Sequence, residues 1–150
     1  MHEYSTQTNS REETHLLGEK IGSHLKGNMV ILLDGDLGAG KTTLTQGIAK
    51  GLHIKKNITS PTFTILKIYH GDMTLYHIDA YRLEGISQDL GFEELLDDDG
   101  VTVIEWAQYV PDLIPEEYLE ISVNLLENDA RNFHMKAYGK QYEELLEEIA

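Results

Sequence analysis

The chain of 150 residues carries 26 acidic and 12 basic side chains, which gives a formal net charge of −14 at pH 7. This acidity disfavours direct binding to RNA or DNA, because non-specific affinity for nucleic acid depends on Lys and Arg. The chain has no cysteine, which excludes disulfides and Cys-based zinc sites. The apolar runs are too short to span a membrane and the first residues do not resemble a signal peptide, so we expect one cytoplasmic domain over residues 1–150.

The first predicted element is a helix that begins after Ser10 and ends near Gly27. Ser10 followed by Glu13 matches a capping box, in which each side chain accepts a hydrogen bond from the other residue's backbone N–H. Apolar side chains recur at helical spacing along one face, which we expect to pack on the core. They are Leu16, Leu17, Ile21 and Leu25.

Residues 35–42, GDLGAGKT, match the phosphate-binding P-loop pattern G-x-x-x-x-G-K-T. The loop follows an apolar run typical of a strand covered on both faces, predicted for 29–34. After the loop, apolar residues at helical spacing predict a helix that ends near Gly51; they are Leu44, Ile48 and Leu52. A P-loop needs this place between a buried strand and a helix, so the match predicts binding of a nucleoside triphosphate. The alternative is an unrelated Gly-rich turn before a helix.

The residue types of the loop indicate its chemistry. Glycine tolerates conformations that a Cβ forbids, so successive backbone N–H groups point inward and wrap the β-phosphate. Lys41 reaches the β- and γ-phosphates, and the Thr42 hydroxyl suits Mg²⁺. Thr43 is either a second phosphate contact or an ordinary residue of the first helical turn. The residues expected to hold the nucleotide here are Asp36, Leu37, Gly38, Ala39, Gly40, Lys41, Thr42 and Thr43.

The rest of the chain predicts two hairpins, a buried strand and two more helices. In chain order these are strands at 63–69 and 73–79, a short helix around 92–96, a strand at 101–105, strands at 118–126 and 133–138, and a helix at 141–149. Together with the P-loop unit, they predict an α/β protein with a three-layer P-loop NTPase fold and a mixed β-sheet.

Two acidic residues at strand ends are candidates for the carboxylate that holds Mg²⁺ in such a site. Glu105 follows the more continuous apolar run and ranks first by strand burial, whereas Asp79 follows an alternating strand. Each also has a structural alternative, a solvated Glu or a turn Asp. His77 and Tyr81 flank Asp79 at alternating positions, although a lone strand histidine is more often structural. Trp106, the single tryptophan, is either a stacking or partner surface or a core residue.

Several functional classes are disfavoured by what the sequence lacks. Arginine occurs only as Arg11, Arg82 and Arg131, few for a small-molecule kinase that clamps two charged substrates. The base-reading motif of guanine-nucleotide switches and an ABC-type signature are both missing. A P-loop phosphotransferase and a nucleotide-sensing adaptor stay open as alternatives to a nucleotide hydrolase.

Four motifs in this order resemble the bacterial TsaE (YjeE/YdiB-type) ATPase family: GDLGAGKTT at 35–43, SPTFT at 60–64, HIDAYRL at 77–83 and IEWA at 104–107. The resemblance covers residues from about 10 to 140 and implies a weak Mg²⁺-dependent ATPase. It implies partnership with the proteins TsaB and TsaD in the threonylcarbamoyladenosine modification of tRNA position 37. The leading interpretation is therefore a hydrolase that couples ATP to the conformational cycle of a protein complex. The tRNA is then contacted only through the complex, which agrees with the acidic charge.

Carried over by motif, the resemblance gives catalytic roles to Lys41, Asp79 and Glu105, and metal roles to Thr42, Asp79 and Glu105. Thr62 then lies in a switch-like loop, and Glu105 and Trp106 lie near the nucleotide. The family pattern thus raises Asp79, which strand burial alone ranks second. Which of the two carboxylates ligates Mg²⁺ directly, which residues select adenine and what the oligomeric state is stay open.

Overall fold

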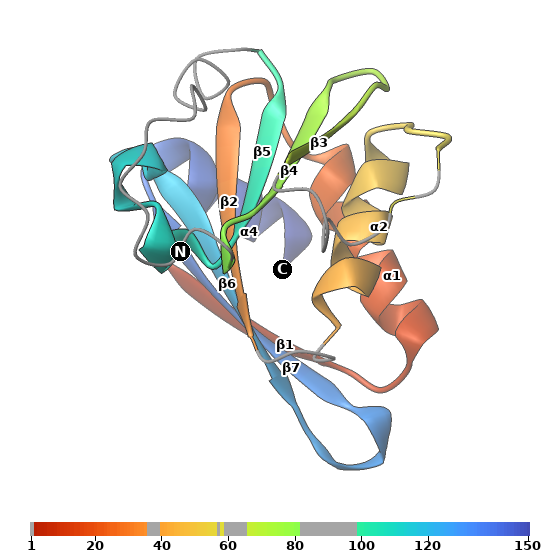
Figure 1. The fold of residues 1–150 in the computed structure, drawn as a ribbon. Helices are drawn as coiled ribbons and strands as arrows, with labels where there is room; N and C mark the ends of the chain where they lie inside the picture. Colours follow the sequence, from red (N-terminus) through yellow and green to blue (C-terminus); the bar gives the residue numbers. More distant parts are fainter. Residues whose placement is uncertain (1, 36–39, 57, 59–65, 82–98) are drawn as a thin grey trace.

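Seven strands of the described chain form one mixed β-sheet in the order β1-β7-β6-β2-β5-β4-β3 (Figure 1). The structure, a computed structural model, describes residues 2–35, 40–56, 58, 66–81 and 99–150. The strands are β1 Glu3–Thr8, β2 Met29–Gly35, β3 Leu66–Tyr69, β4 Leu75–Asp79, β5 Val101–Glu105, β6 Tyr118–Leu125 and β7 Arg131–Tyr138.

The centre of this sheet is parallel and its flanks are antiparallel. β5 pairs in parallel with β2 and with β4, and β2 also pairs in parallel with β6. The remaining pairs, at β3, β7 and β1, are antiparallel. Because parallel strands end at the same edge of a sheet, the last residues of β2, β5 and β4 lie close together. Asp79 lies directly opposite Glu105 in this register.

The α-helices of the described chain share one core cluster with the sheet. These helices are α1 Arg11–Ser23, α2 Lys41–Gly51 and α4 Lys140–Ile149, and they pack against alternate strand residues such as Ile31 and Val103. A smaller cluster, with Leu32 and Ile104 from the opposite face, contacts the short 3₁₀ helices η2 Ala107–Tyr109 and η3 Pro111–Leu113. A further 3₁₀ turn, η4 Glu127–Asp129, joins β6 to β7. The predicted α/β class with a mixed sheet is therefore confirmed.

No helix within the described ranges is long and apolar enough to cross a membrane.

Helices α1 and α2 pack with their backbones in contact (Figure 1). Gly18 and Gly22 of α1 lie against α2, and Gly47 and Gly51 of α2 lie against α1. A Cβ at any of the four would lie less than 3.0 Å from a carbonyl oxygen of the other helix. Only glycine permits this approach, and it fixes α2, which begins at Lys41, against α1.

Most elements expected from the sequence are present, including both hairpins, the strand and helix around the P-loop, and the last helix. The N-cap half of the capping box is confirmed, since the Ser10 hydroxyl accepts a hydrogen bond from the Glu13 N–H at 3.1 Å, while the Glu13 side chain accepts a hydrogen bond from the Ser10 hydroxyl at 3.4 Å. The helix expected around 92–96 and the first residues of the strand expected at 63–69 lie outside the described residues.

Two features of the N-terminal segment differ from expectation. Leu16, placed by its spacing on the packed face of the first helix, is 61% exposed. That prediction was wrong because the glycines, together with Ile21, form the face of α1 that meets the core. The strand β1 was not predicted, since Glu3–Thr8 is polar and pairs only with β7, at the edge of the sheet.

The close approach of α1 and α2 predicts a loss of stability for Gly22→Ala. Alanine favours an isolated helix by about 1 kcal/mol over glycine, but its Cβ would clash with the Ile48 carbonyl group. We expect urea unfolding to show a net loss of about 1–3 kcal/mol, the range for overpacked sites. Lys20→Ala, at an exposed position of the same helix, is the control and should stay within about 0.5 kcal/mol of the wild type. Equal stability of the two variants would contradict the backbone contact.

Candidate functional site

The structure describes the residues at the two ends of the P-loop, Gly35 and Gly40 to Thr42. Gly35 closes β2, and Gly40 precedes α2 with a φ of 106°, a left-handed conformation that favours glycine. A Cβ at Gly40 would lie 2.8 Å from Cδ and Nε of Arg131, so the start of β7 packs on the loop. The predicted site residues Asp36, Leu37, Gly38, Ala39 and Thr62 lie outside the described residues.

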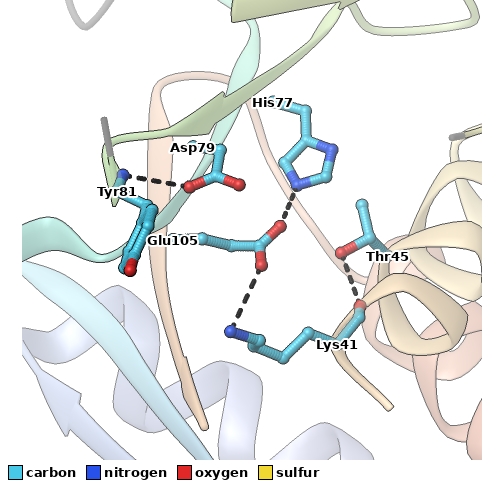
Figure 2. Close-up of polar contacts among 6 residues, drawn as sticks. All are labelled: Lys41, Thr45, His77, Asp79, Tyr81 and Glu105. Carbon is cyan, nitrogen blue, oxygen red and sulfur yellow. Dashed lines mark hydrogen bonds and ion pairs between the residues drawn. The ribbon is translucent and has the colours of Figure 1, made fainter. Parts of the chain in front are cut away.

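Lys41 begins α2 and directs its side chain toward the ends of β4 and β5 (Figure 2). Its Nζ lies 3.5 Å from Oε1 of Glu105, and both side chains are almost inaccessible, at 7% and 6% exposure. The Lys41 carbonyl accepts a hydrogen bond from the Thr45 hydroxyl at 2.9 Å. A lysine ammonium is rarely buried unless it is paired, so the Glu105 carboxylate is what permits this position.

Glu105 is held from a second side by His77 of β4. Nε2 of His77 lies 2.6 Å from Oε2 of Glu105, and the His77 side chain is fully buried. Burial alone would raise the pKa of the Glu105 carboxyl. The hydrogen bond from His77 and the charges of His77 and Lys41 outweigh burial, so the pKa lies below its ordinary value of 4.5. Glu105 is therefore a buried carboxylate that stays ionised at neutral pH.

Asp79 lies beside Glu105 at the end of β4, in a more accessible position. Its Oδ1 accepts a hydrogen bond from the Tyr81 N–H at 3.1 Å (Figure 2). Partial burial raises the pKa of Asp79, opposed by the Tyr81 hydrogen bond and reinforced by the charge of Glu105. The two candidate carboxylates thus come together at one edge of the sheet, because β4 and β5 are parallel neighbours.

An aromatic group borders the lysine. Trp106 follows β5 with a φ of 58°, an unusual left-handed conformation for a bulky residue, and this conformation turns the chain into η2. Its ring lies 5.1 Å from the Tyr81 ring and 6.0 Å from the nearly parallel Tyr109 ring. Lys41 Nζ lies 5.1 Å from the centre of the Trp106 ring, within the range of a cation–π contact. Because Trp106 is partly exposed, it is not a plain core residue.

This arrangement suits a triphosphate with a hard divalent cation. The N-terminus of α2 and Lys41 supply positive potential for phosphate oxygens, and Thr42 and Thr43 lie partly buried in the first turn of α2. Within the described ranges, no group of three His, Asp or Glu side chains could hold a metal ion unaided. Thr42, Asp79 and Glu105 offer the oxygen donors that Mg²⁺ prefers, and phosphate oxygens and water usually complete its coordination.

Sequence reasoning named Lys41, Asp79 and Glu105 as candidates for one site, and the structure brings these three residues together. It missed the partner of Glu105. It treated His77 as a lone strand histidine. The alternation of His77 and Asp79 along the strand was a usable signal, since side chains two residues apart share a face. It became informative only once β4 was known to pair with β5. The proximity of Arg131 to Gly40 had no signal in the sequence.

The lowered pKa of Glu105 predicts a pH-dependent contribution to stability. A carboxyl with a depressed pKa in the folded state stabilises it above the unfolded pKa, near 4.5, and this contribution is lost as pH falls through the folded pKa. At neutral pH, Glu105→Gln should lose about 3–5 kcal/mol, the usual cost of breaking a buried ion pair. Urea unfolding in EDTA should show that the difference in unfolding free energy between wild type and Glu105→Gln becomes smaller below pH 4.5.

The control for this measurement is Glu116→Gln, at an exposed carboxylate. Its unfolding free energy should follow that of the wild type throughout the titration. If the difference in unfolding free energy between wild type and Glu105→Gln stays constant through the acid range, the pKa of Glu105 is the same in the folded and unfolded chains, which contradicts the prediction.

Comparison with known proteins identifies the family. Residues 8–133 match the family model described as threonylcarbamoyl adenosine biosynthesis protein TsaE. A curated Bacillus subtilis relative, tRNA threonylcarbamoyladenosine biosynthesis protein TsaE, is 41% identical over 100% of this chain and 96% of its own length. The Treponema pallidum protein of the same name is 43% identical over 81% of this chain and 92% of its own length.

A solved structure agrees with these matches. The crystal structure of YdiB from Bacillus subtilis superposes with a TM-score of 0.85 and 35% identity, and the match covers 98% of this chain and 93% of that chain. It confirms the predicted fold class. The chain therefore belongs to the TsaE family of threonylcarbamoyl adenosine biosynthesis proteins.

Proposed function

We propose that this chain is a slow, Mg²⁺-dependent ATPase that supports threonylcarbamoyladenosine modification of tRNA position 37. The observation that carries the proposal is the buried contact of Lys41, at the start of α2, with Glu105 at the end of β5. A lysine at this position is the phosphate-binding group of a P-loop, and a carboxylate at the end of the neighbouring parallel strand is the acidic group that such sites require.

The first role is phosphate binding. When the nucleotide binds, Lys41 leaves Glu105 and pairs with the β- and γ-phosphates. The ammonium of Lys41 thus exchanges a carboxylate partner for a phosphate partner. The backbone N–H groups of residues 36–43 and the N-terminal end of α2 add further positive potential. Gly40 has to remain glycine, because its φ of 106° is a backbone conformation that other residues rarely adopt.

The second role is to organise hydrolysis. Thr42, Asp79 and Glu105 would hold Mg²⁺, directly or through water, and bound Mg²⁺ would neutralise charge on the β- and γ-phosphates. Glu105 faces the position that Lys41 vacates, which suits an oxygen acceptor that orients the attacking water. Asp79, more accessible and with a raised pKa, is better suited to a water-mediated contact. Trp106 borders the same position and would lie beside the nucleotide.

The third role lies in an assembly with TsaB and TsaD. A chain with a net charge of −14 is poorly suited to grip tRNA alone, so the tRNA would be held through the complex. The exposed ring of Tyr81 and the partly exposed rings of Trp106 and Tyr109 lie beside Lys41, and we propose that a partner protein contacts them and so changes turnover. The assembly would act in the cytoplasm, where tRNA is modified.

The decisive experiment is phosphate release from ATP and from GTP, with and without TsaB and TsaD. We expect slow, ATP-selective release that rises when both partners are present. Lys41→Ala should reduce it about 10²–10³-fold, the scale for losing one preorganised charge at a reacting centre. Lys50→Ala, an exposed lysine in the last turn of the same helix, is the matched control and should behave as wild type.

Unchanged turnover of a folded Lys41→Ala variant would refute the phosphate-binding assignment. Turnover that ignores both partners, and rises instead with an acceptor molecule, would favour a phosphotransferase.

The metal role of Asp79 has a separate test. Asp79→Ala should shift the Mg²⁺ dependence of turnover to higher concentrations, because one oxygen donor near the phosphates is lost. Asp72→Ala removes an exposed carboxylate from the β3–β4 turn and should leave the titration unchanged. Superimposable Mg²⁺ titrations of Asp79→Ala and wild type would assign Asp79 a purely structural role.

A further inference from the structure

His77 is a buried histidine whose ring has a hydrogen-bond partner at only one nitrogen among the described residues. His77 lies in β4 at 0% exposure, between strands β3 and β5. Its Nε2 contacts Glu105, whereas its Nδ1 is buried and has no hydrogen-bond partner among the residues that the structure describes. An apolar side chain would fill this space without burying an unpaired nitrogen. The histidine is therefore suited to a task at Glu105 rather than to packing alone.

His77 and Lys41 contact different oxygens of the Glu105 carboxylate, and the contact with His77 is the shorter one (Figure 2). The distance from His77 Nε2 to Oε2 is 2.6 Å, that of a short charge-assisted hydrogen bond. The distance from Lys41 Nζ to Oε1 is 3.5 Å, an ion pair without a close hydrogen bond. The carboxylate is thus anchored through one oxygen by His77, while its other oxygen faces a cation that it can release.

The direction of this hydrogen bond follows from the chemistry of the pair. An ionised carboxylate only accepts hydrogen bonds, so Nε2 of His77 carries the proton and donates it to Oε2. This bond fixes the tautomer or protonation of the ring at Nε2 and the rotation of the carboxylate plane. β4 and β5 are neighbours in register, with Asp79 opposite Glu105 and His77 one pleat earlier on the same face. The anchor is therefore part of the rigid sheet.

We propose that His77 is a positioning residue that keeps Glu105 in place when Lys41 leaves it for the nucleotide. The inference rests on the proposed function, because it assumes that Glu105 acts on the nucleotide or its water. Without His77, Glu105 would follow the lysine or turn toward solvent. With His77, Oε1 stays fixed at the position where the phosphate chain arrives.

Two substitutions separate positioning from packing. His77→Leu keeps an apolar volume but removes the donor, whereas the amide nitrogen of His77→Gln lies the same number of bonds from the backbone as Nε2 and can still donate. We expect His77→Leu to lower kcat about 10–100-fold, the usual effect of losing a group that orients a site residue, with KM for ATP almost unchanged. His77→Gln should recover most of kcat.

A matched control removes a buried polar group from the adjacent strand. Thr102 in β5 is 1% exposed and lies on the opposite face of the sheet from Glu105, so Thr102→Val should alter stability without altering kcat. Urea unfolding of all three variants would show whether they are folded under assay conditions. Equal kcat losses in His77→Leu and Thr102→Val would overturn the proposal, because a general loss of packing would then explain both.

A measurement without nucleotide tests the anchor directly. In ¹⁵N-histidine-labelled protein, the Nε2–H proton of His77 should give a downfield, slowly exchanging NMR signal, identified by its absence in His77→Gln. Glu105→Ala should abolish this signal, because its acceptor is gone. A signal that persists unchanged in Glu105→Ala would show that His77 does not hold Glu105 and would overturn the proposal.

The kinetic results also distinguish this inference from the proposed function. If Glu105→Gln abolishes turnover but His77→Leu does not reduce it, the positioning role fails while the ATPase assignment stands. If Glu105→Gln itself leaves turnover unchanged, Glu105 has no part in hydrolysis, so the positioning role of His77 fails together with the role proposed for Glu105, whereas the ATPase assignment stands or falls with Lys41→Ala.

Discussion

Burying the charge of Lys41 is the constraint on which the rest of the site depends. An ammonium withdrawn from water needs an anion beside it, and Glu105 meets that need at 7% and 6% exposure of the two side chains. The pair forms only because α2 begins opposite the end of β5, at the edge where parallel strands terminate together. If a phosphate takes the place of Glu105 beside Lys41, as proposed, it would meet an ammonium that is already largely desolvated, so little reorganisation would be needed on binding.

The order of the strands explains why so many functional groups meet at this edge. β5 lies between β2, which leads into the P-loop, and β4, which carries His77 and Asp79. Groups far apart in the chain thereby become neighbours through strand pairing. The rigid sheet holds the acidic side of the site, and one helix holds the basic side. His77, Asp79 and Glu105 lie on the same face of the sheet as the large core cluster.

Much of this arrangement could be predicted from the sequence, because the P-loop is a local pattern and buried parallel strands are continuous apolar runs. The pairing of His77 with Glu105 could not, since it depends on which strands are neighbours. Leu16 misled the prediction of the first helix because spacing alone does not show that glycines form the contact. The polar edge strand β1 had no apolar alternation to reveal it, and the turn at Trp106 depends on a backbone conformation that its residue type does not favour.

The glycine contact between α1 and α2 has a mechanical consequence. Sliding between packed helices requires a layer of side chains that can exchange rotamers, and here backbone atoms meet with no such layer between them. We therefore expect the two helices to move together, so that a tilt of α2 would also tilt α1. The Thr14 hydroxyl of α1 is in turn bonded to Thr8 at the end of β1, at 2.7 Å. A small displacement of the N-terminal end of α2 would thus be transmitted through α1 to β1, at the outer edge of the sheet.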